Sequence, residues 1–183
     1  MKPTPFQISR RSFLRRVSAT AAATGLPLWF IERQLAAAQE TSKPVTSPNE
    51  RPRVALIGCG SMGSGDATNA QRFGDIVTVC DVDENQLDVA VKKFSRDGKS
   101  PVRFSDFRKL LESGGIDAII NGTPDHWHSL INIGAAKAKK DIYSEKPLTL
   151  TIDEGKQVVK AVRNNQVILQ TGTQQRSSQR FRM

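Results

Sequence analysis

The residues that point most directly to chemistry form a glycine-rich turn between a short apolar run and a segment with helical character. The turn reads Gly58-Cys59-Gly60-Ser61-Met62-Gly63. In this context the first glycine allows a tight turn, the second lets the backbone approach a pyrophosphate, and the third lets helix and strand pack closely. Ser61 and Met62 would open the helix, where free N–H groups and the positive end of the helix dipole favour phosphate. The turn therefore predicts dinucleotide binding.

Asp81 supplies the second half of this prediction. It ends the next apolar run and stands 18 residues beyond Gly63, close to the offset of about 20 expected for the acid of a dinucleotide-binding unit. A carboxylate there accepts hydrogen bonds from ribose hydroxyls and repels a 2′-phosphate, so NAD is favoured over NADP. The alternative is a glycine turn with a strand-end aspartate and no ligand.

Two further loops carry groups that could contact a cofactor or a substrate. The first reads Asn121-Gly122-Thr123-Pro124-Asp125-His126-Trp127-His128, and the second reads Glu145-Lys146-Pro147. Both follow expected strands at their carboxyl ends, where open α/β sheets bind their ligands. We therefore place the candidate site at this edge of the sheet.

The candidates in these loops also have structural interpretations. Lys146 could be a solvated lysine at a strand end. His126 and His128 have no third metal ligand nearby, so we predict no metal site. We expect one histidine to line the cofactor loop and the other to cap or pack. Trp127 could stack on a sugar or pack on a helix, and the sequence leaves both open.

The hydropathy pattern over residues 53–170 indicates the elements that would position these groups. Expected strands are apolar runs at 54–57, 76–80, 102–104, 118–120, 142–143 and 167–169, and expected helices lie at 62–72, 84–94, 106–113, 126–138 and 152–164. Asp83 with Gln86, and Thr151 with Glu154, fit capping boxes. Strands alternating with helices favour right-handed crossovers. The predicted fold is α/β, a Rossmann-type doubly wound parallel sheet of about six strands.

The glycine turn, Asp81 and the two loops together resemble the glucose–fructose oxidoreductase / inositol dehydrogenase (Gfo/Idh/MocA) family. The resemblance runs from about Arg53 to the end of the chain, and Glu-Lys-Pro is its most specific motif. It implies a pyrophosphate turn, a ribose-binding acid, a loop beside the nicotinamide ribose and a further cofactor contact. The residues that match these roles are, in that order, Gly58, Gly60 and Gly63; Asp81; Thr123, Pro124 and His128; and Glu145.

The resemblance also implies a reaction. Lys146 matches the lysine that faces the substrate and assists proton transfer from the reacting hydroxyl, and an ammonium there lowers the cost of a developing alkoxide. Hydride would pass between a sugar or cyclitol carbon and the nicotinamide, whose ring chemistry belongs to the cofactor. Many family members have a cis bond before the proline of the motif, so we expect one between Lys146 and Pro147.

Members of the family continue into a second α/β domain that covers the nicotinamide and supplies most substrate contacts, including a catalytic histidine. This chain has only His126 and His128, and 13 residues follow residue 170. We therefore expect the second domain to be truncated, with 171–183 as its start or as a disordered tail. Catalysis by this chain alone is then in doubt. The uncovered face favours association, which leaves a homo-oligomer open.

Residues 1–38 combine a positive region, an apolar stretch and small residues at 36–38, the three parts of an export signal. Arg10 and Arg11, followed by Phe-Leu, resemble the twin-arginine signal, whose pathway exports folded proteins. Gly25 and Pro27 interrupt the apolar stretch, so we predict no stable membrane span. An uncleaved tether and a basic amphipathic helix are the alternatives. We expect a periplasmic location and a linker at 39–52.

The net charge of +9 is concentrated in this leader, which holds six Lys or Arg residues against one Glu. The remainder has no basic run, so nucleic acid is not a predicted partner. Cys59 and Cys80 are too few for a disulfide framework and fall at expected strand ends. We expect them to behave as small buried hydrophobes rather than as catalytic thiols.

Three functions therefore stand. The first is the NAD(P)-binding domain of an exported oxidoreductase that transfers hydride between a nicotinamide cofactor and a sugar or polyol. The second is an NAD-dependent glycosidase of the same family, similar to α-N-acetylgalactosaminidase. The third is a truncated domain that binds nucleotide without turnover. The residues that select a substrate would lie in the second domain.

Overall fold

The computed structural model describes residues 51–178 and 181. The predicted leader and residues 39–50 of the predicted linker lie outside the described residues. The described strands are β1 (Arg53–Ile57), β2 (Asp75–Cys80), β3 (Val102–Phe104), β4 (Ala118–Asn121), β5 (Asp141–Glu145) and β6 (Leu169–Gly172). The helices are α3 (Ser61–Ala70), α4 (Glu84–Phe94), α5 (Phe107–Glu112), α6 (Asp125–Lys137) and α7 (Ile152–Asn165), with a short 3-10 turn, η1 (Gln174–Ser177).

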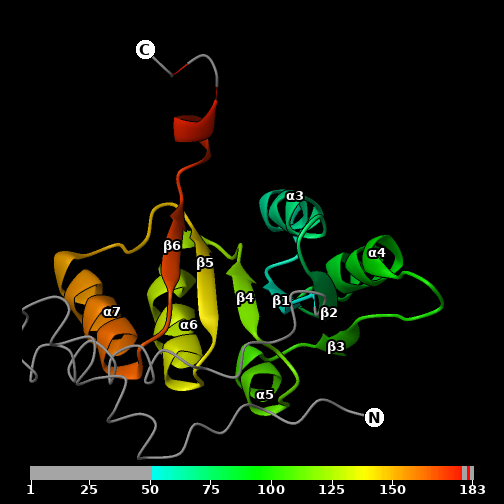
Figure 1. Ribbon diagram of the computed structural model, residues 1–183, viewed down its shortest axis with the longest axis horizontal. Helices are drawn as coiled ribbons and strands as arrows, with labels where there is room; N and C mark the ends of the chain where they lie inside the picture. The colour runs from blue at the N-terminus through cyan, green and yellow to red at the C-terminus, as the bar shows by residue number, and fades with distance from the viewer. Residues whose placement is uncertain (1–50, 179–180, 182–183) are drawn as a thin grey trace, which may run out of the picture. The chain divides into compact units, whose positions relative to one another are not determined.

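The six strands form one parallel sheet in the order β3-β2-β1-β4-β5-β6. The chain runs outward from β1 to one edge, returns to β4 beside β1, and then runs to the other edge (Figure 1). This is the doubly wound order of the Rossmann fold, and it confirms the predicted fold class. The order reverses between β1 and β4, where such sheets leave a crevice for ligands.

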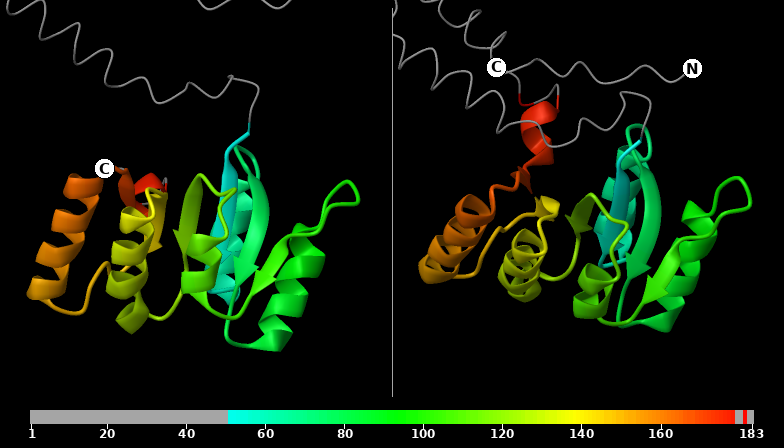
Figure 2. Two further views of the ribbon diagram at one scale, coloured as in Figure 1. Left: turned by 90° about the horizontal axis from the view of Figure 1, so that it is seen from below. Right: turned by 60° about the horizontal axis from the view of Figure 1, so that its bottom comes forward.

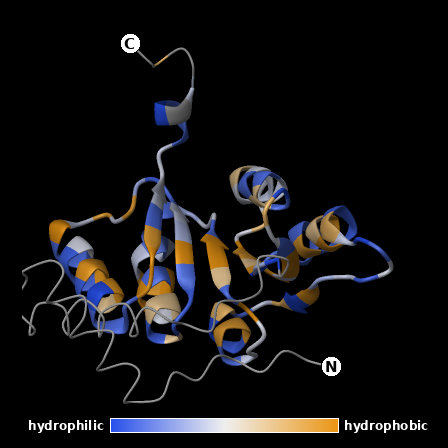
Figure 3. Cartoon of the chain, in the orientation of Figure 1, coloured by the Kyte–Doolittle hydropathy of each residue, from blue (hydrophilic) through white to orange (hydrophobic). Residues whose placement is uncertain are grey.

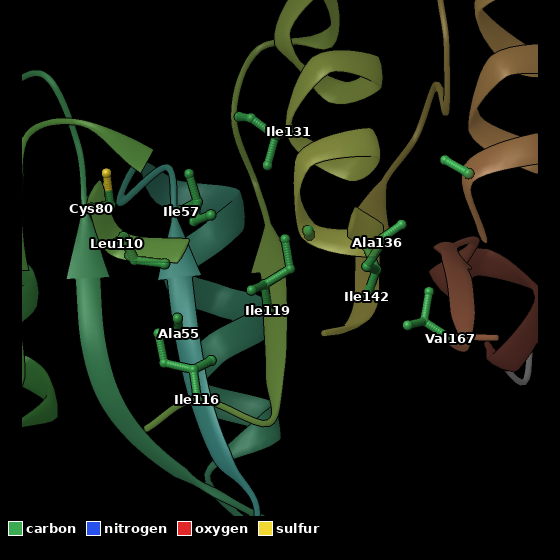
Figure 4. Packing of buried hydrophobic residues seen from close by; sticks show 12 residues of the cluster. Ala55, Ile57, Cys80, Leu110, Ile116, Ile119, Ile131, Ala136, Ile142 and Val167 are labelled. Atoms are coloured by element: carbon green, nitrogen blue, oxygen red, sulfur yellow. The ribbon is translucent and has the colours of Figure 1, made fainter. Parts of the chain in front are cut away.

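Alternation along the strands builds a core on each face of the sheet. On β1, Ala55 and Ile57 face a cluster with α5, α6 and α7, whereas Val54 and Leu56 face a cluster with α3 and α4. Figure 4 shows the first of these clusters, and Figure 2 shows helices on both sides of the sheet. In Figure 3 hydrophobic colour covers most of β4, and on α7 it alternates with hydrophilic bands. Burial on both faces is what a parallel sheet requires.

Of the two capping boxes predicted from the sequence, the structure contains the one at the start of α7 and lacks the one at the start of α4. Thr151 and Glu154 exchange both hydrogen bonds of a capping box at the start of α7, which confirms that prediction. Asp83 caps α4, but its side chain accepts from the Asn85 N–H (2.8 Å), and at this described helix start the Gln86 side chain accepts no reciprocal bond from the Asp83 N–H. The Asp83 N–H, which would donate to Gln86 in a capping box, donates instead to Asp81 Oδ1 (3.0 Å), and this explains the difference.

The last strand lies further along the chain than its apolar residues suggest. The prediction was 167–169, whereas β6 is Leu169–Gly172. Val167 closes α7 instead, because its N–H donates to the Val162 carbonyl (3.3 Å) and its side chain is buried. The strand then continues through polar residues, which an edge strand tolerates because only one side of it is paired.

No helix in the described part of the chain is both long and apolar enough to cross a bilayer.

Candidate functional site

The carboxyl ends of β1, β2, β4 and β5 meet at one edge of the sheet, the upper edge in Figure 1. Ile57 of β1 pairs with Cys80 of β2 on one side and with Asn121 of β4 on the other, and Asn121 pairs in turn with Ser144 of β5. The loops that follow these residues are the ones that carry the predicted site residues. The topology therefore brings them together at the switch point of the sheet.

Three glycines in mutual contact shape the turn after β1. Gly58 has φ +89°, and a Cβ there would lie 2.6 Å from the Gly122 carbonyl carbon and the Thr123 nitrogen. A Cβ on Gly63 would lie 2.1 Å from the Gly58 oxygen, and one on Gly122 would lie 2.5 Å from the Gly63 Cα. No side chain fits at any of the three. Sequence reasoning missed Gly122, whose place beside the turn depends on the pairing of β1 with β4.

Gly60 differs from these glycines because its Cβ position is open, with no described heavy atom within 4 Å. It is the N-cap of α3, where no side chain caps the helix and the first turn holds no acid. Ser61 and Met62, the next two residues, are exposed. By contrast, Asp83, Asp106 and Thr151 cap α4, α5 and α7. The free N–H groups at the start of α3 therefore suit a phosphate.

The Asp81 carboxylate lies across the glycine turn. Its Oδ2 accepts from the Cys59 N–H (2.6 Å), between two of the glycines, and its Oδ1 accepts from the Asp83 N–H (3.0 Å). Each carboxylate oxygen can accept more than one hydrogen bond, so both oxygens keep capacity for ribose hydroxyls. These backbone donors hold the acid at the end of β2 beside the turn. Asp83 follows it and adds negative charge to the same loop, whereas Glu84 begins α4 and is paired with Arg103.

The loop after β4 is held by a buried polar network. Asn121 donates to the Asn132 side chain (2.9 Å), Asn132 donates to Ser144 (2.9 Å), and all three residues are buried. The Thr123 hydroxyl donates to Asn121 Oδ1 (2.7 Å), which orients that side chain. Pro124 is the N-cap of α6 and has no side-chain cap. Of these residues, sequence reasoning singled out only Thr123 and Pro124.

The two histidines occupy different environments. The His128 ring is 1% exposed, and its two nitrogens contact the Thr123 and Pro147 carbonyls. The His126 side chain is 60% exposed. Trp127 packs edge-on against Phe107 at 6.4 Å between ring centroids and is 42% exposed, so helix packing accounts for part of its surface. In the described residues, no three His, Cys, Asp or Glu side chains gather as metal ligands would.

Glu145 is buried at the end of β5, and its Oε1 accepts a hydrogen bond from the Gln174 side chain of η1. Asp66 of α3 lies close enough for its carboxyl group to interact electrostatically with that of Glu145, and among the described residues its Oδ2 is buried without a hydrogen-bond partner. Burial and the neighbouring Glu145 raise the pKa of Asp66 to about 6. Burial, followed by these two carboxylates, also raises the pKa of Tyr143. A Cβ on Gly172 would lie 2.5 Å from Glu145 Oε1, so the last strand approaches this cluster through a glycine.

Replacing Asp66 by Asn is expected to remove a pH dependence of stability. Because the pKa of Asp66 rises from its usual 3.8 to about 6 on folding, its stabilisation is present below about pH 4 and is lost as the pH rises through about 6. Asn keeps a donor toward Glu145 with no proton to lose. Between about pH 5 and pH 7.5 the wild-type melting temperature should fall relative to Asp66→Asn.

Thermal melts across this range provide the measurement. Asp97→Asn is the matched control, because the Asp97 side chain is 87% exposed and its replacement should leave the wild-type pH dependence in place. Parallel curves for wild type and Asp66→Asn would contradict the assigned pairing with Glu145.

Lys146 follows Glu145 and is exposed at the same edge of the sheet. The structure gives its ammonium no hydrogen bond or ion pair with any described residue. The bond from Lys146 to Pro147 is cis, as expected. Lys146 follows the buried residue Glu145, which fixes the backbone beside it. The Lys146 ammonium can therefore reach a ligand above the strand ends without first breaking a contact with a described residue.

The cysteines are structural. Cys59 and Cys80 are free, with exposures of 2% and 3%. Burial, followed by the charge of Asp81, raises the pKa of each thiol to about 12. Protonated thiols are poor nucleophiles, which agrees with the prediction that these residues act as small hydrophobes.

A hollow of about 720 Å³ lies at the opposite edge of the sheet, lined by residues that include Arg51, Asp75 and Phe94. Its position is at the amino ends of the strands, away from the edge where doubly wound sheets bind ligands. The Arg51 guanidinium already pairs with Asp75 (2.8 Å) and donates to the Gly74 carbonyl (2.8 Å), so these contacts would compete with a ligand in the hollow. The carboxyl edge remains the candidate site.

Residues 52–173, which contain the whole candidate site, are similar to a known protein family. A family model described as "Oxidoreductase family, NAD-binding Rossmann fold" matches residues 52–173. The chain belongs to the Gfo/Idh/MocA family. This confirms the resemblance predicted from the glycine turn and the two loops, and the described residues form the NAD-binding domain of that family.

Individual members of the Gfo/Idh/MocA family show how far the similarity extends. A "Glycosyl hydrolase family 109 protein" of Shewanella pealeana is 29% identical over 87% of this chain and 38% of that protein. The "Myo-inositol 2-dehydrogenase" of Thermotoga maritima is 29% identical over 71% of this chain and 38% of the enzyme. The chain thus spans about two fifths of the length of these relatives.

Among solved structures, the WlbA dehydrogenase from Bordetella pertussis, in complex with NADH and UDP-GlcNAcA, superposes with a TM-score of 0.64. It is 27% identical, and the match covers 70% of this chain and 37% of that one. A dehydrogenase whose structure matches this region of the chain therefore binds NADH.

Proposed function

We propose that this chain is the nucleotide-binding part of an NAD-dependent oxidoreductase that acts on a sugar or polyol. The observation that carries the proposal is the position of Asp81, whose carboxylate is fixed across the glycine turn by the Cys59 N–H (2.6 Å). A ribose bound above the turn would meet that carboxylate. A 2′-phosphate would meet the negative charges of Asp81 and Asp83 in one loop, which favours NAD over NADP.

The residues present fit such a cofactor. The open Cβ position of Gly60 and the uncapped start of α3, with Ser61 and Met62, leave room and free donors for the pyrophosphate. Thr123 and Pro124 lie on the neighbouring loop and would flank the nicotinamide half. When bound, the nicotinamide supplies the hydride donor or acceptor. Buried Glu145 fixes the backbone beside Lys146, which would exchange a proton with the substrate hydroxyl.

Titration with NAD tests the proposal. NAD is expected to quench tryptophan fluorescence and to raise the melting temperature, with NADP weaker in both measurements. Gly60→Ala should weaken NAD binding about tenfold or more, because its Cβ would enter the open space above the turn, and should change stability by less than about 0.5 kcal/mol.

The matched control for Gly60→Ala is Gly65→Ala, which is also exposed and also meets nothing within 4 Å, but lies beyond the first turn of α3. It should bind NAD as the wild type does. No response of the wild-type protein to either nucleotide would sink the proposal.

A second candidate is an NAD-dependent glycosidase, which the relatives themselves support. The family 109 proteins of Shewanella match 79–87% of this chain, whereas the inositol dehydrogenase matches 71%. In such an enzyme, oxidation and re-reduction of the sugar would leave no net NADH. Release of nitrophenol from a nitrophenyl glycoside, with no accumulation of NADH, would select this function. Net NADH formation from a polyol would select the first.

The chain alone could also bind nucleotide without turnover, as a third candidate. In that case NAD would still quench tryptophan fluorescence and raise the melting temperature, and neither assay would give product. We also propose that copies of this chain associate through the face that is turned toward the substrate. Sedimentation with and without NAD would show whether a dimer forms and whether the nucleotide disperses it.

We further propose that residues 1–38 direct export to the periplasm by the twin-arginine pathway. The support is the Arg10-Arg11 pair ahead of the apolar stretch. Replacing both arginines by lysine keeps the charge and should retain the protein in the cytoplasm. Cell fractionation measures this, and an unchanged periplasmic fraction in the variant would rule out this route.

A further inference from the structure

Trp127 is a large aromatic side chain that stays partly open at the carboxyl edge of the sheet. It lies in the first turn of α6, where its backbone N–H donates to the Pro124 carbonyl (3.0 Å), and its side chain is 42% exposed. Phe107, the first residue of α5, meets the indole edge-to-face, with 6.4 Å between ring centroids and 67° between ring planes. Because an edge-to-face pair uses at most one face of either ring, Phe107 leaves at least one indole face uncovered.

The contacts of Phe107 hold this aromatic pair in place. Asp106 caps α5 by accepting from the Arg108 N–H (2.9 Å), and the Arg108 guanidinium lies over the Phe107 ring, 5.6 Å from its centroid. Phe107 also packs against the buried cluster on this face of the sheet. The indole is therefore positioned before any ligand arrives, which lowers the entropy that a ligand loses by ordering it.

Trp127 and His128 are neighbours in the first turn of α6, yet their side chains contact different parts of the site. The Nδ1 atom of His128 lies 2.6 Å from the Pro147 carbonyl oxygen, in the loop that carries Lys146. The Trp127 ring contacts Phe107 of α5 instead. The indole is thus turned away from Lys146 and toward the side of the sheet that holds β3 and β2.

The start of α5 lies next to the acid predicted to bind ribose. The Asp81 N–H donates to the Phe104 carbonyl (3.2 Å), three residues before Phe107. Val82, the residue after Asp81, is an apolar side chain that is 88% exposed. These contacts place the Trp127 indole and Val82 on the half of the crevice that contains Asp81.

The chemistry of the two halves decides between a base and a sugar as the partner of the indole. A sugar that exchanges a proton with Lys146 would lie at the end of β5, on the other half of the crevice. The ribose that Asp81 would bind carries adenine, a flat aromatic ring. Stacking on an aromatic side chain stabilises any nucleotide base, because every base has a π face.

We propose that Trp127 is the stacking surface for the adenine ring of NAD, with Val82 as an apolar contact beside it. This role deepens the proposed function and rests on it. It also separates the two interpretations of Trp127 that the sequence left open: the buried part of the side chain packs on α5, and the exposed part binds the base of the cofactor rather than the sugar.

Tryptophan fluorescence tests which half of the cofactor meets the indole. The chain contains two tryptophans, Trp29 in the predicted leader and Trp127, so Trp29→Phe leaves the indole of Trp127 as the only one. ADP-ribose carries the adenosine half of NAD, and nicotinamide mononucleotide carries the other half. In Trp29→Phe, saturating ADP-ribose should quench the fluorescence and nicotinamide mononucleotide should not. Quenching by nicotinamide mononucleotide alone would overturn the proposal.

Affinity for ADP-ribose, measured by calorimetry, gives the second test. Trp127→Leu keeps an apolar side chain without a stacking ring and should bind about tenfold more weakly, whereas Trp127→Phe keeps a ring and should bind within about threefold of the wild type. Val159→Ala is the matched control, because Val159 is 45% exposed but lies on α7, and its affinity should be unchanged. A side chain that only packs on Phe107 would change the melting temperature of the free protein and leave this affinity unaltered.

The two tests separate the possible failures. If neither NAD nor ADP-ribose binds the wild-type protein, the proposed function is defeated, and the role of Trp127 with it. If ADP-ribose binds but neither quenches Trp127 nor binds Trp127→Leu more weakly, only the role of Trp127 is defeated. If Trp127→Leu does not fold, the fluorescence of Trp29→Phe decides.

Discussion

Replacing Gly63 by alanine is expected to abolish NAD binding and to destabilise the domain by about 3 kcal/mol or more. The new Cβ would lie 2.1 Å from the Gly58 carbonyl oxygen. That oxygen cannot move away easily, because the Gly58 N–H is bonded to the Cys80 carbonyl (2.8 Å) and the turn is closed on its other side by Gly122. The clash is between backbone atoms, so no side-chain rotation relieves it.

The chain contains a matched control two residues away. Gly65 lies on the same helix with open space at its Cβ position. Alanine there should raise stability by about 0.5–1 kcal/mol, because alanine is the better helix former. Denaturant unfolding of both variants, followed by NAD titration, gives the comparison. Equal stabilities for Gly63→Ala and Gly65→Ala would show that the close contact of turn and helix has been misassigned.

Replacing Lys146 by methionine is expected to lower turnover by about a hundredfold to ten-thousandfold while leaving NAD affinity within about twofold. Lys146 is exposed and has no protein partner among the described residues, so its loss should not disturb the fold. If it exchanges a proton with the substrate hydroxyl, the loss appears in kcat. The assay requires a preparation that turns over, either the chain itself or the chain joined to a substrate domain like that of its relatives.

Lys156→Met is the control for charge and for general surface effects. Lys156 is also exposed, at 70%, but lies on α7 in an ion pair with Asp153 (2.8 Å). Its replacement should leave turnover and NAD affinity unchanged. A Lys146→Met variant with wild-type kcat would remove Lys146 from the proposed chemistry and leave it as a solvated lysine.

Sequence reasoning predicted those parts of the site whose conformation is determined by residues close together in the chain. The glycine turn was recognised from spacing alone: Gly58 and Gly63 stand where no side chain fits, and Gly60 stands where the space above the turn is open. α4 matched its predicted bounds because Asp83 caps it and its buried residues follow a helical period. Strand ends were less certain: β5 continues past Tyr143 to Glu145, since a buried carboxylate has no apolar signal.

The residues that sequence reasoning missed are defined by partners distant in the chain. Asp66 is an ordinary polar residue of α3 until β5 places Glu145 beside it. Asn132 and Ser144 form a buried network with Asn121 only after α6 packs on the sheet. Such residues could be found only through buried polar positions on otherwise apolar faces, and Asn132 within α6 is the clearest of these.

The pairing of β1 with β4 has a consequence for how the molecule comes into being. Val54 pairs with Ala118, so three βα units, from β1 to α5, must be made before the central strands of the sheet can meet. Contacts between residues so distant in the chain form slowly, because the chain entropy between them is lost first. The phosphate-binding turn, closed by Gly122, cannot exist in a half-made domain. The ability to bind a nucleotide is therefore acquired late in folding and in a single step. Nucleotide binding can then be used to detect when folding is complete.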